Sequence, residues 1–211
     1  MSGLLFSSVR GMFVAFCRVW LRLRVLHTER LPEGPFILAP NHRSYFDTPI
    51  TAAITKRRMR YMGKAQFFRP APFGWFCKAL GAFPVNRDTI DREALRRCLD
   101  ILANGEALVI FPEGTRKLGS AVEGLFEGAA YLALKSQLPV VPLGIGGTER
   151  ALGKGMRWIR PRRCSVVVGE PIAPPTLQSA VANRTTIRAF TEQLNVALQA
   201  VFNEAERVIA E

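Results

Sequence analysis

Short apolar runs alternate with longer amphipathic stretches along most of this chain, and this alternation restricts the possible folds more than any other feature. The strand candidates are "FILAP" (36–40), "MRYMG" (59–63), "FPVN" (83–86), "ALVIF" (107–111), "PVVPLGI" (139–145) and "RCSVVVGEPI" (163–172). The helix candidates are 45–55, 71–80, 88–105, 123–137 and a long C-terminal stretch. The pattern predicts an α/β fold with a mostly parallel central sheet flanked by helices. Pro84 argues for an edge position of the 83–86 strand.

Polar side chains follow two of these strands directly. His42 and Asp47, in "NHRSYFD", come after 36–40, and "PEGTR" (112–116) comes after 107–111. Sites in parallel sheets form in the loops beyond the carboxyl ends of the strands. The sequence therefore predicts that the two loops share one site, with Glu113, Gly114, Thr115 and Arg116 as candidates beside the His/Asp pair.

The pair itself has two interpretations. Ser44 and Asp47 have the spacing of a capping box, which would leave His42 as a polar loop residue. Alternatively, His42 is a base and Asp47 the carboxylate that orients it. Both can hold together, because Asp47 can lie in the first turn of a helix and still face His42.

Cations are expected near the same edge of the sheet. Lys64 follows the second predicted strand, and Arg87 follows the third. Together with Arg116 they describe a place for a phosphate-bearing substrate beside a base.

The first 28 residues are expected to form a separate N-terminal segment, and residues 29–211 the main domain. Arginines interrupt the apolar run too often for a signal peptide or a membrane span. On a helix, the apolar residues gather on one face and the arginines on the other. The apolar face comprises Leu5, Val9, Met12, Phe13, Phe16, Val19, Trp20 and Leu23, and the basic face Arg10, Arg18, Arg22 and Arg24. This pattern favours a helix in a membrane interface, with a helix packed on the domain as the alternative.

A net charge of +12 implies an anionic partner, which includes nucleic acid, anionic lipid or a phosphorylated small molecule. We find no helix-turn-helix, RNA-recognition or zinc signature, so nucleic acid is not expected. The four cysteines are widely spaced and the histidines number only two, which argues against a metal site and suits a reducing cytosol. A second basic cluster spans 149–163, and Trp158 within it is either an interfacial aromatic or a core residue.

Four motifs in order resemble the glycerolipid acyltransferases, most closely the lysophosphatidic acid (1-acylglycerol-3-phosphate) acyltransferases. They are "NHRSYFD", the segment from "GKAQFF" to "FPVNR", "FPEGTR", and "VVPLGIGG" around Pro142. The resemblance extends from about residue 29 to about residue 171. It is specific because the four motifs occur together at the family's spacing.

The resemblance implies transfer of a fatty acyl group from acyl-CoA, or from acyl carrier protein, to the free hydroxyl of lysophosphatidic acid, which yields phosphatidic acid. His42 would be the general base and Asp47 its orienting partner. Arg87 and Arg116, with Lys64, would hold the phosphate of the acceptor, and Glu113 would position its loop or the acceptor. No metal or cofactor is implied beyond the acyl donor.

The same resemblance implies a peripheral or monotopic protein on the cytoplasmic face of the cell membrane, with a phospholipid surface as partner and the N-terminal helix as anchor. Two alternatives stay open. One is acylation of a different acceptor, such as glycerol 3-phosphate or another lysophospholipid. The other is a non-catalytic basic module that binds membranes or nucleic acid.

Overall fold

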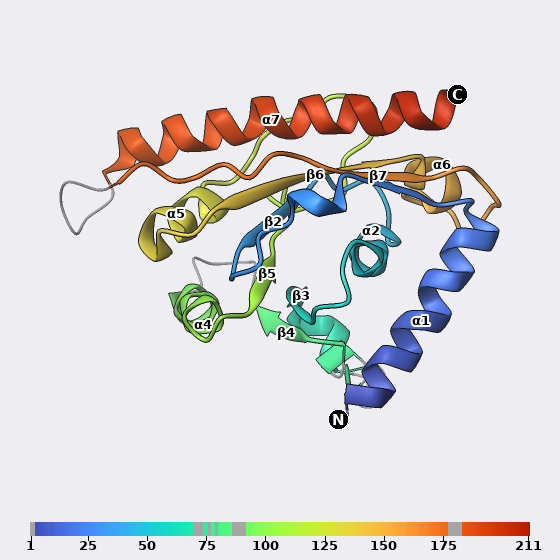
Figure 1. Ribbon diagram of the computed structural model, residues 1–211, viewed down its shortest axis with the longest axis horizontal. Coiled ribbons are helices and arrows are strands. Elements are labelled where there is room, and N and C mark those ends of the chain that lie inside the picture. Colours follow the sequence, from blue (N-terminus) through green and yellow to red (C-terminus); the bar gives the residue numbers. More distant parts are fainter. Residues whose placement is uncertain (1–2, 70–73, 76, 79, 86–91, 177–182) are drawn as a thin grey trace.

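A seven-stranded sheet forms the centre of the computed structural model, which describes residues 3–69, 74–75, 77–78, 80–85, 92–176 and 183–211 (Figure 1). The strands are β1 (Arg24–Leu26), β2 (Ile37–Pro40), β3 (Met59–Lys64), β4 (Ala82–Val85), β5 (Ala107–Val109), β6 (Val140–Gly146) and β7 (Ser165–Val168). Their order is β1-β7-β6-β2-β5-β3-β4. Pairing is parallel from β6 to β4, whereas β7 is antiparallel to β6. The predicted α/β class is confirmed, and β4 with its Pro84 does lie at an edge.

Helices cover both faces of this sheet. They are α1 (Gly3–Trp20), α2 (Asp47–Ile50), α4 (Arg92–Ala103), α5 (Gly128–Ser136), α6 (Thr148–Leu152) and α7 (Arg184–Ala210), with short 3-10 turns at Thr28–Arg30, Thr51–Ala53 and Ala65–Phe68. One face packs against α4, α5 and α7, and the opposite face against α1 and α2 (Figure 1).

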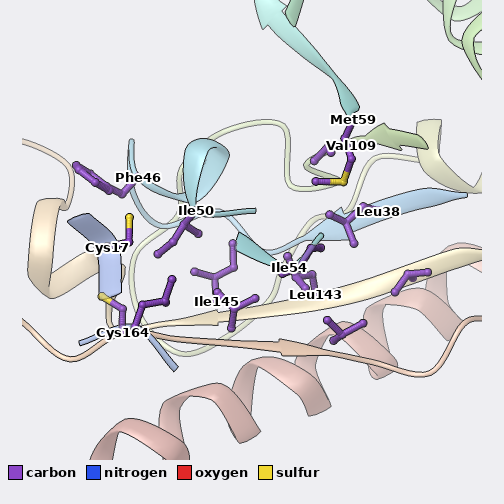
Figure 2. Close-up of a cluster of buried hydrophobic side chains, with 14 of the residues drawn as sticks. Cys17, Leu38, Phe46, Ile50, Ile54, Met59, Val109, Leu143, Ile145 and Cys164 are labelled. Atoms are coloured by element: carbon purple, nitrogen blue, oxygen red, sulfur yellow. The ribbon is translucent and has the colours of Figure 1, made fainter. Parts of the chain in front are cut away.

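Alternation along the strands divides the core into these two layers, because successive strand side chains point to opposite faces. In β2, Leu38 packs on the side of α1 and α2, whereas Ile37 and Ala39 pack on the side of α4 and α5. Figure 2 shows part of the first layer, in which side chains from α1, α2 and five strands meet. Its labelled members are Cys17, Leu38, Phe46, Ile50, Ile54, Met59, Val109, Leu143, Ile145 and Cys164.

Two glycines allow α7 to lie directly on β6. The side chains of Leu143 and Ile145 point into the layer beneath α1 and α2, so Gly144 and Gly146 face α7. A Cβ on Gly144 would meet the backbone carbonyl of Val201, and one on Gly146 would lie 2.8 Å from the carbonyl carbon of Ala205. The helix backbone therefore occupies the space that side chains would need.

The N-terminal segment differs in part from its prediction. Helix α1 ends at Trp20, and residues 24–26 form edge strand β1, which pairs with β7. The helix packs on the domain through buried Val14 and Cys17. Both lie outside the predicted apolar face, and several members of that face are exposed instead, namely Met12, Phe16, Val19 and Trp20.

One member of the predicted basic face, Arg10, packs on the domain instead. Its Nε donates to the carbonyls of Ala52 and Thr55, each at 2.9 Å. Arg10 thus joins α1 to the domain. Within the described part of the chain, no helix is long and apolar enough to cross a bilayer.

Other boundaries also shift. The predicted helix at 45–55 is a single α-helical turn, α2, continued by a 3-10 turn, and the predicted helix at 123–137 begins only at Gly128. The predicted helix at 71–80 lies largely outside the described residues, as does the predicted start of α4 at Asp88.

Candidate functional site

Three neighbouring parallel strands, β6, β2 and β5, end at the same edge of the sheet. His42 lies two residues after β2, Glu113 four residues after β5, and Thr148 two residues after β6. The two predicted loops therefore do meet, and a third loop joins them.

His42 and Asp47 are in direct contact. The Nδ1 atom of His42 lies 2.9 Å from Oδ2 of Asp47, and the side chains are 16% and 0% exposed. The ring of His42 also packs against Phe111, with 4.3 Å between the ring centroids. An ionised carboxylate only accepts hydrogen bonds, so this contact places the proton on Nδ1 and leaves Nε2 with a free lone pair.

The carboxylate of Asp47 accepts hydrogen bonds from three further donors. Its Oδ2 accepts hydrogen bonds from the backbone amides of Arg43 and Ser44, at 2.5 and 2.6 Å. Its Oδ1 accepts from the hydroxyl of Thr148 at 2.6 Å, and both side chains are fully buried. These bonds fix which oxygen faces His42.

Only one of the two hydrogen bonds of the predicted capping box forms. Asp47 accepts from the amide of Ser44, as that motif requires. The hydroxyl of Ser44, however, accepts from the amide of Phe46 at 3.0 Å and donates to the carbonyl of Leu152 at 2.6 Å. Phe46 is the N-cap of α2, without a side-chain bond. Asp47 thus takes part in both a local turn and the contact with His42.

Asn41 sets the position from which this loop leaves the sheet. Its side-chain amide donates to the carbonyl of Ile145 at 3.1 Å, and its Oδ1 accepts from the amide of Ile145 at 2.7 Å. A side chain thereby continues the β2–β6 pairing one residue beyond the strand. The backbone that leads into the next residue, His42, is therefore fixed relative to the sheet.

A buried ion pair joins the His loop to the "PEGTR" loop. Nη1 of Arg43 lies 2.8 Å from both carboxylate oxygens of Glu113, and both residues are 1% exposed. Glu113 also accepts from the backbone amide of His42 at 2.7 Å. The other nitrogens of Arg43 donate to the carbonyls of Gly119 and Ala121. Glu113 therefore connects the two loops and holds the backbone of His42 in place.

Arg116 lies across the ring of Tyr45, with its Cζ 3.5 Å from the ring centroid. Its Nη1 is buried and, among the described residues, finds no hydrogen-bond partner. Thr115 is exposed, and Gly114 adopts a φ of +66°, which glycine tolerates best. The loop thus places the guanidinium of Arg116 against Tyr45, three positions after His42. One donor of this guanidinium has no partner among the described residues.

The two other predicted cations are placed less fully. Lys64 is the last residue of β3, the neighbour of β5, so its backbone ends at the same sheet edge. Its side chain, like the whole of Arg87, lies outside the described residues.

Arg43, Asn41 and Thr148 were not among the predicted site residues. Thr148 follows the apolar strand 140–146 as directly as His42 follows β2, so the rule that found His42 could also have found it. Arg43 carried no such signal, because a basic residue in a loop is usually solvated.

Known proteins are similar to this chain in sequence and in fold. The acyltransferase family model matches residues 22–146. A Bacillus subtilis protein named 1-acyl-sn-glycerol-3-phosphate acyltransferase is 26% identical over 188 residues, which cover 88% of this chain and 91% of that protein. A Chlamydomonas reinhardtii protein of the same name is 29% identical over 160 residues, which cover 72% of this chain and 47% of that protein.

The crystal structure of the 1-acyl-sn-glycerophosphate (LPA) acyltransferase PlsC from Thermotoga maritima is also similar. It gives a TM-score of 0.75 at 25% identity, and the match covers 92% of this chain and 78% of that one. The chain spans about half the length of several relatives, such as the Chlamydomonas protein and a Streptococcus pneumoniae protein matched over 54% of its length. Because the family model matches more than half of its residues, the chain belongs to the acyltransferase family.

Proposed function

We propose that this protein transfers a fatty acyl group from acyl-CoA, or from acyl carrier protein, to the free hydroxyl of lysophosphatidic acid, with phosphatidic acid as the product. The observation that carries the proposal is the 2.9 Å contact between His42 Nδ1 and Asp47 Oδ2 at the carboxyl end of the sheet. The names of the relatives and of the similar crystal structure support the same reaction.

In this mechanism His42 accepts the proton of the acceptor hydroxyl at Nε2 while the oxygen attacks the thioester carbonyl. Asp47 keeps the proton on Nδ1 and stabilises the imidazolium that forms. The tetrahedral intermediate then collapses: the C–S bond breaks, the ester remains, and the imidazolium returns its proton to the departing thiolate. The substrate supplies the nucleophile, so no serine or cysteine of the protein is required.

The phosphate of the acceptor would bind at Arg116. Its buried Nη1 has no partner among the described residues, and a phosphate oxygen would satisfy it. Tyr45 holds the guanidinium plane by stacking. Lys64 and Arg87 remain proposed phosphate contacts, whereas buried Glu113 would act through its bonds to His42 and Arg43 rather than by touching substrate.

We further propose a peripheral position on the cytoplasmic face of the cell membrane. Both acceptor and product are lipids, and α1 leaves Met12, Phe16, Val19 and Trp20 exposed on its outer side. An exposed row of this kind suits the boundary between headgroups and acyl chains. No cofactor besides the acyl donor enters the proposed reaction.

The proposal is tested by acyl transfer from radiolabelled acyl-CoA to lysophosphatidic acid in lipid vesicles. His42→Ala should lower kcat by about 10²–10⁴-fold, because general-base catalysis and the geometry around it are lost. His27→Ala is the matched control, since the side chain of this second histidine pairs with Glu29 and Glu204 away from the candidate site, and it should keep activity.

The same assay separates the alternatives. Glycerol 3-phosphate and lysophosphatidylcholine are offered as rival acceptors, and a strong preference for either would overturn the proposed acceptor while keeping the reaction. Equal activity of wild type and His42→Ala would overturn the base assignment. Arg116→Gln should raise the KM for phosphate-bearing acceptors more than it lowers kcat, because it removes a binding contact.

A further inference from the structure

The loop that follows α6, residues 153–163, is called the basic loop below. It carries five exposed cations and no acidic residue; the cations are Lys154, Arg157, Arg160, Arg162 and Arg163. Such a density of one sign of charge creates a local positive field that attracts anions.

None of these five cations forms an ion pair within the described part of the chain. Arginines elsewhere in the fold behave differently: Arg150 lies 2.8 Å from Glu206, and Arg30 lies 2.8 Å from Glu170. The basic loop is thus a place where the fold gathers positive charge and supplies no carboxylate to balance it.

Trp158 is held outward at the centre of this charge. It is 83% exposed, whereas its neighbour Ile159 packs against the core layer beneath α1. The loop is fixed on both sides of Trp158, because the amide of Met156 donates to the carbonyl of Gly153 at 3.2 Å and the amide of Arg160 to that of Ala151 at 2.9 Å. The alternative of a tryptophan tucked into the core is therefore wrong.

The basic loop lies beside the exposed end of α1. Figure 1 shows the orange chain after α6 passing next to the C-terminal end of the blue helix. Arg22 and Arg163 line one hollow of about 320 Å³ together with Arg24, whose own charge is paired with Glu211. Arg22 also has no ion pair among the described residues. The hollow brings cations from the two segments together, and Glu211 is the acidic residue of its lining.

The basic loop also begins at the candidate site. The carbonyl of Leu152, the residue before it, accepts the hydroxyl of Ser44, whose amide donates to Asp47. A surface that contacts the basic loop is therefore close to the loop that carries His42.

We propose that the basic loop is a second membrane contact, which binds the headgroups of anionic phospholipids through its free cations and inserts Trp158 at the interface. With the exposed side of α1 it makes one continuous lipid-facing surface. Arginines suit lipid phosphates, and tryptophan prefers the headgroup level of a bilayer. The inference deepens the proposed function by naming the surface that brings its site to lipid.

The first test is sedimentation of the full chain with sucrose-loaded phosphatidylcholine vesicles containing phosphatidylglycerol, without acyl donor or acceptor. The variant Arg157→Gln/Arg160→Gln/Arg162→Gln should partition about 100-fold more weakly, roughly five-fold per arginine. Its control, Arg92→Gln/Arg96→Gln/Arg184→Gln, removes the same charge from exposed positions on α4 and α7, at the end of the molecule away from α1 (Figure 1). Equal weakening by both variants would overturn the proposal.

A second test follows Trp158 alone. In the variant Trp20→Phe/Trp75→Phe it is the only tryptophan left. Its fluorescence should shift to the blue on phosphatidylglycerol vesicles and be quenched by brominated lipid; unchanged emission would overturn its insertion. Binding of single-stranded RNA that depends on the same arginines, without vesicle binding, would assign the surface to nucleic acid instead. Because no substrate is present, a failed acyl-transfer assay leaves these results interpretable.

Discussion

Nη1 of Arg43 lies 2.8 Å from the carboxylate of Glu113, and both side chains are buried. The pair connects the loop after β2 with the loop after β5, and Glu113 extends the connection to the amide of His42. The position of His42 thus depends on a charge pair that never reaches the surface.

Removal of either partner should be costly, because it leaves one buried charge without compensation. We expect Arg43→Met and Glu113→Gln each to lower the free energy of unfolding by about 3–5 kcal/mol. The double variant should lose much less than the sum, since no lone charge remains. Urea denaturation followed by circular dichroism measures all three.

The chain offers a matched surface pair as control. Arg188 and Glu127 lie 3.3 Å apart with side chains 64% and 41% exposed. Arg188→Met and Glu127→Gln should each cost less than about 1 kcal/mol. If the buried pair proves no more sensitive than this one, its structural role is refuted.

Thr148 is expected to act on catalysis through Asp47. Thr148→Val removes the 2.6 Å bond to Oδ1 and leaves a buried carboxylate oxygen short of a donor, which should cost about 1.5–3 kcal/mol of stability. It should also lower kcat by about 10-fold with little change in KM, because the orientation of Asp47 toward His42 is loosened. Thr148→Ser keeps the hydroxyl and should restore kcat. A Ser variant as slow as the Val variant would point to packing instead.

The site residues that directly follow the carboxyl end of a parallel strand could be predicted from the sequence. His42 and Glu113 follow apolar runs that are recognisable from composition, so their meeting could be expected before the structure was known. The contact of Asp47 with His42 was one of two open interpretations, and the structure combines it with half of a capping box.

The remaining site residues depend on tertiary contacts that leave no local pattern. Arg43 is buried because Glu113 and two backbone carbonyls, 70 to 78 residues away, surround it. Strand β1 has only three residues, too few for a period of two to appear. Helical periodicity predicted one apolar face of α1, but Val14 and Cys17, which the domain buries, lie outside that face.

The close contact of α7 with β6 gives a prediction about the fold. Gly144→Ala places a methyl group against the backbone carbonyl of Val201, and a backbone cannot rotate away as a side chain can. We expect a loss of about 1–3 kcal/mol or more in the free energy of unfolding. Gly34→Ala is the control, because a Cβ there meets no atom within 4 Å. Similar melting temperatures for both variants would show that α7 can shift outward at no cost.

The buried thiols predict how the protein responds to alkali. Burial raises the pKa of Cys17 from 9.0 to about 12, and burial with the nearby charge of Asp47 does the same for Cys164. The folded state therefore keeps these protons where the unfolded chain would release them. Below about pH 9 both states hold them, and stability is unaffected. Between pH 9 and 12, each thiol should remove up to about 1.4 kcal/mol per pH unit.

Alkylation by iodoacetamide tests the same burial directly, because the thiolate is the reactive form. At pH 8.5 the native protein should be modified first at half-buried Cys77, while Cys17 and Cys164 react only after denaturant is added. Denaturation at pH 8 and pH 10.5 then compares wild type with Cys17→Ala/Cys164→Ala, which should lose less stability over that interval. Early modification of Cys17 in the native protein would mean that α1 separates from the domain, since Cys17 is fully buried in the core layer beneath this helix.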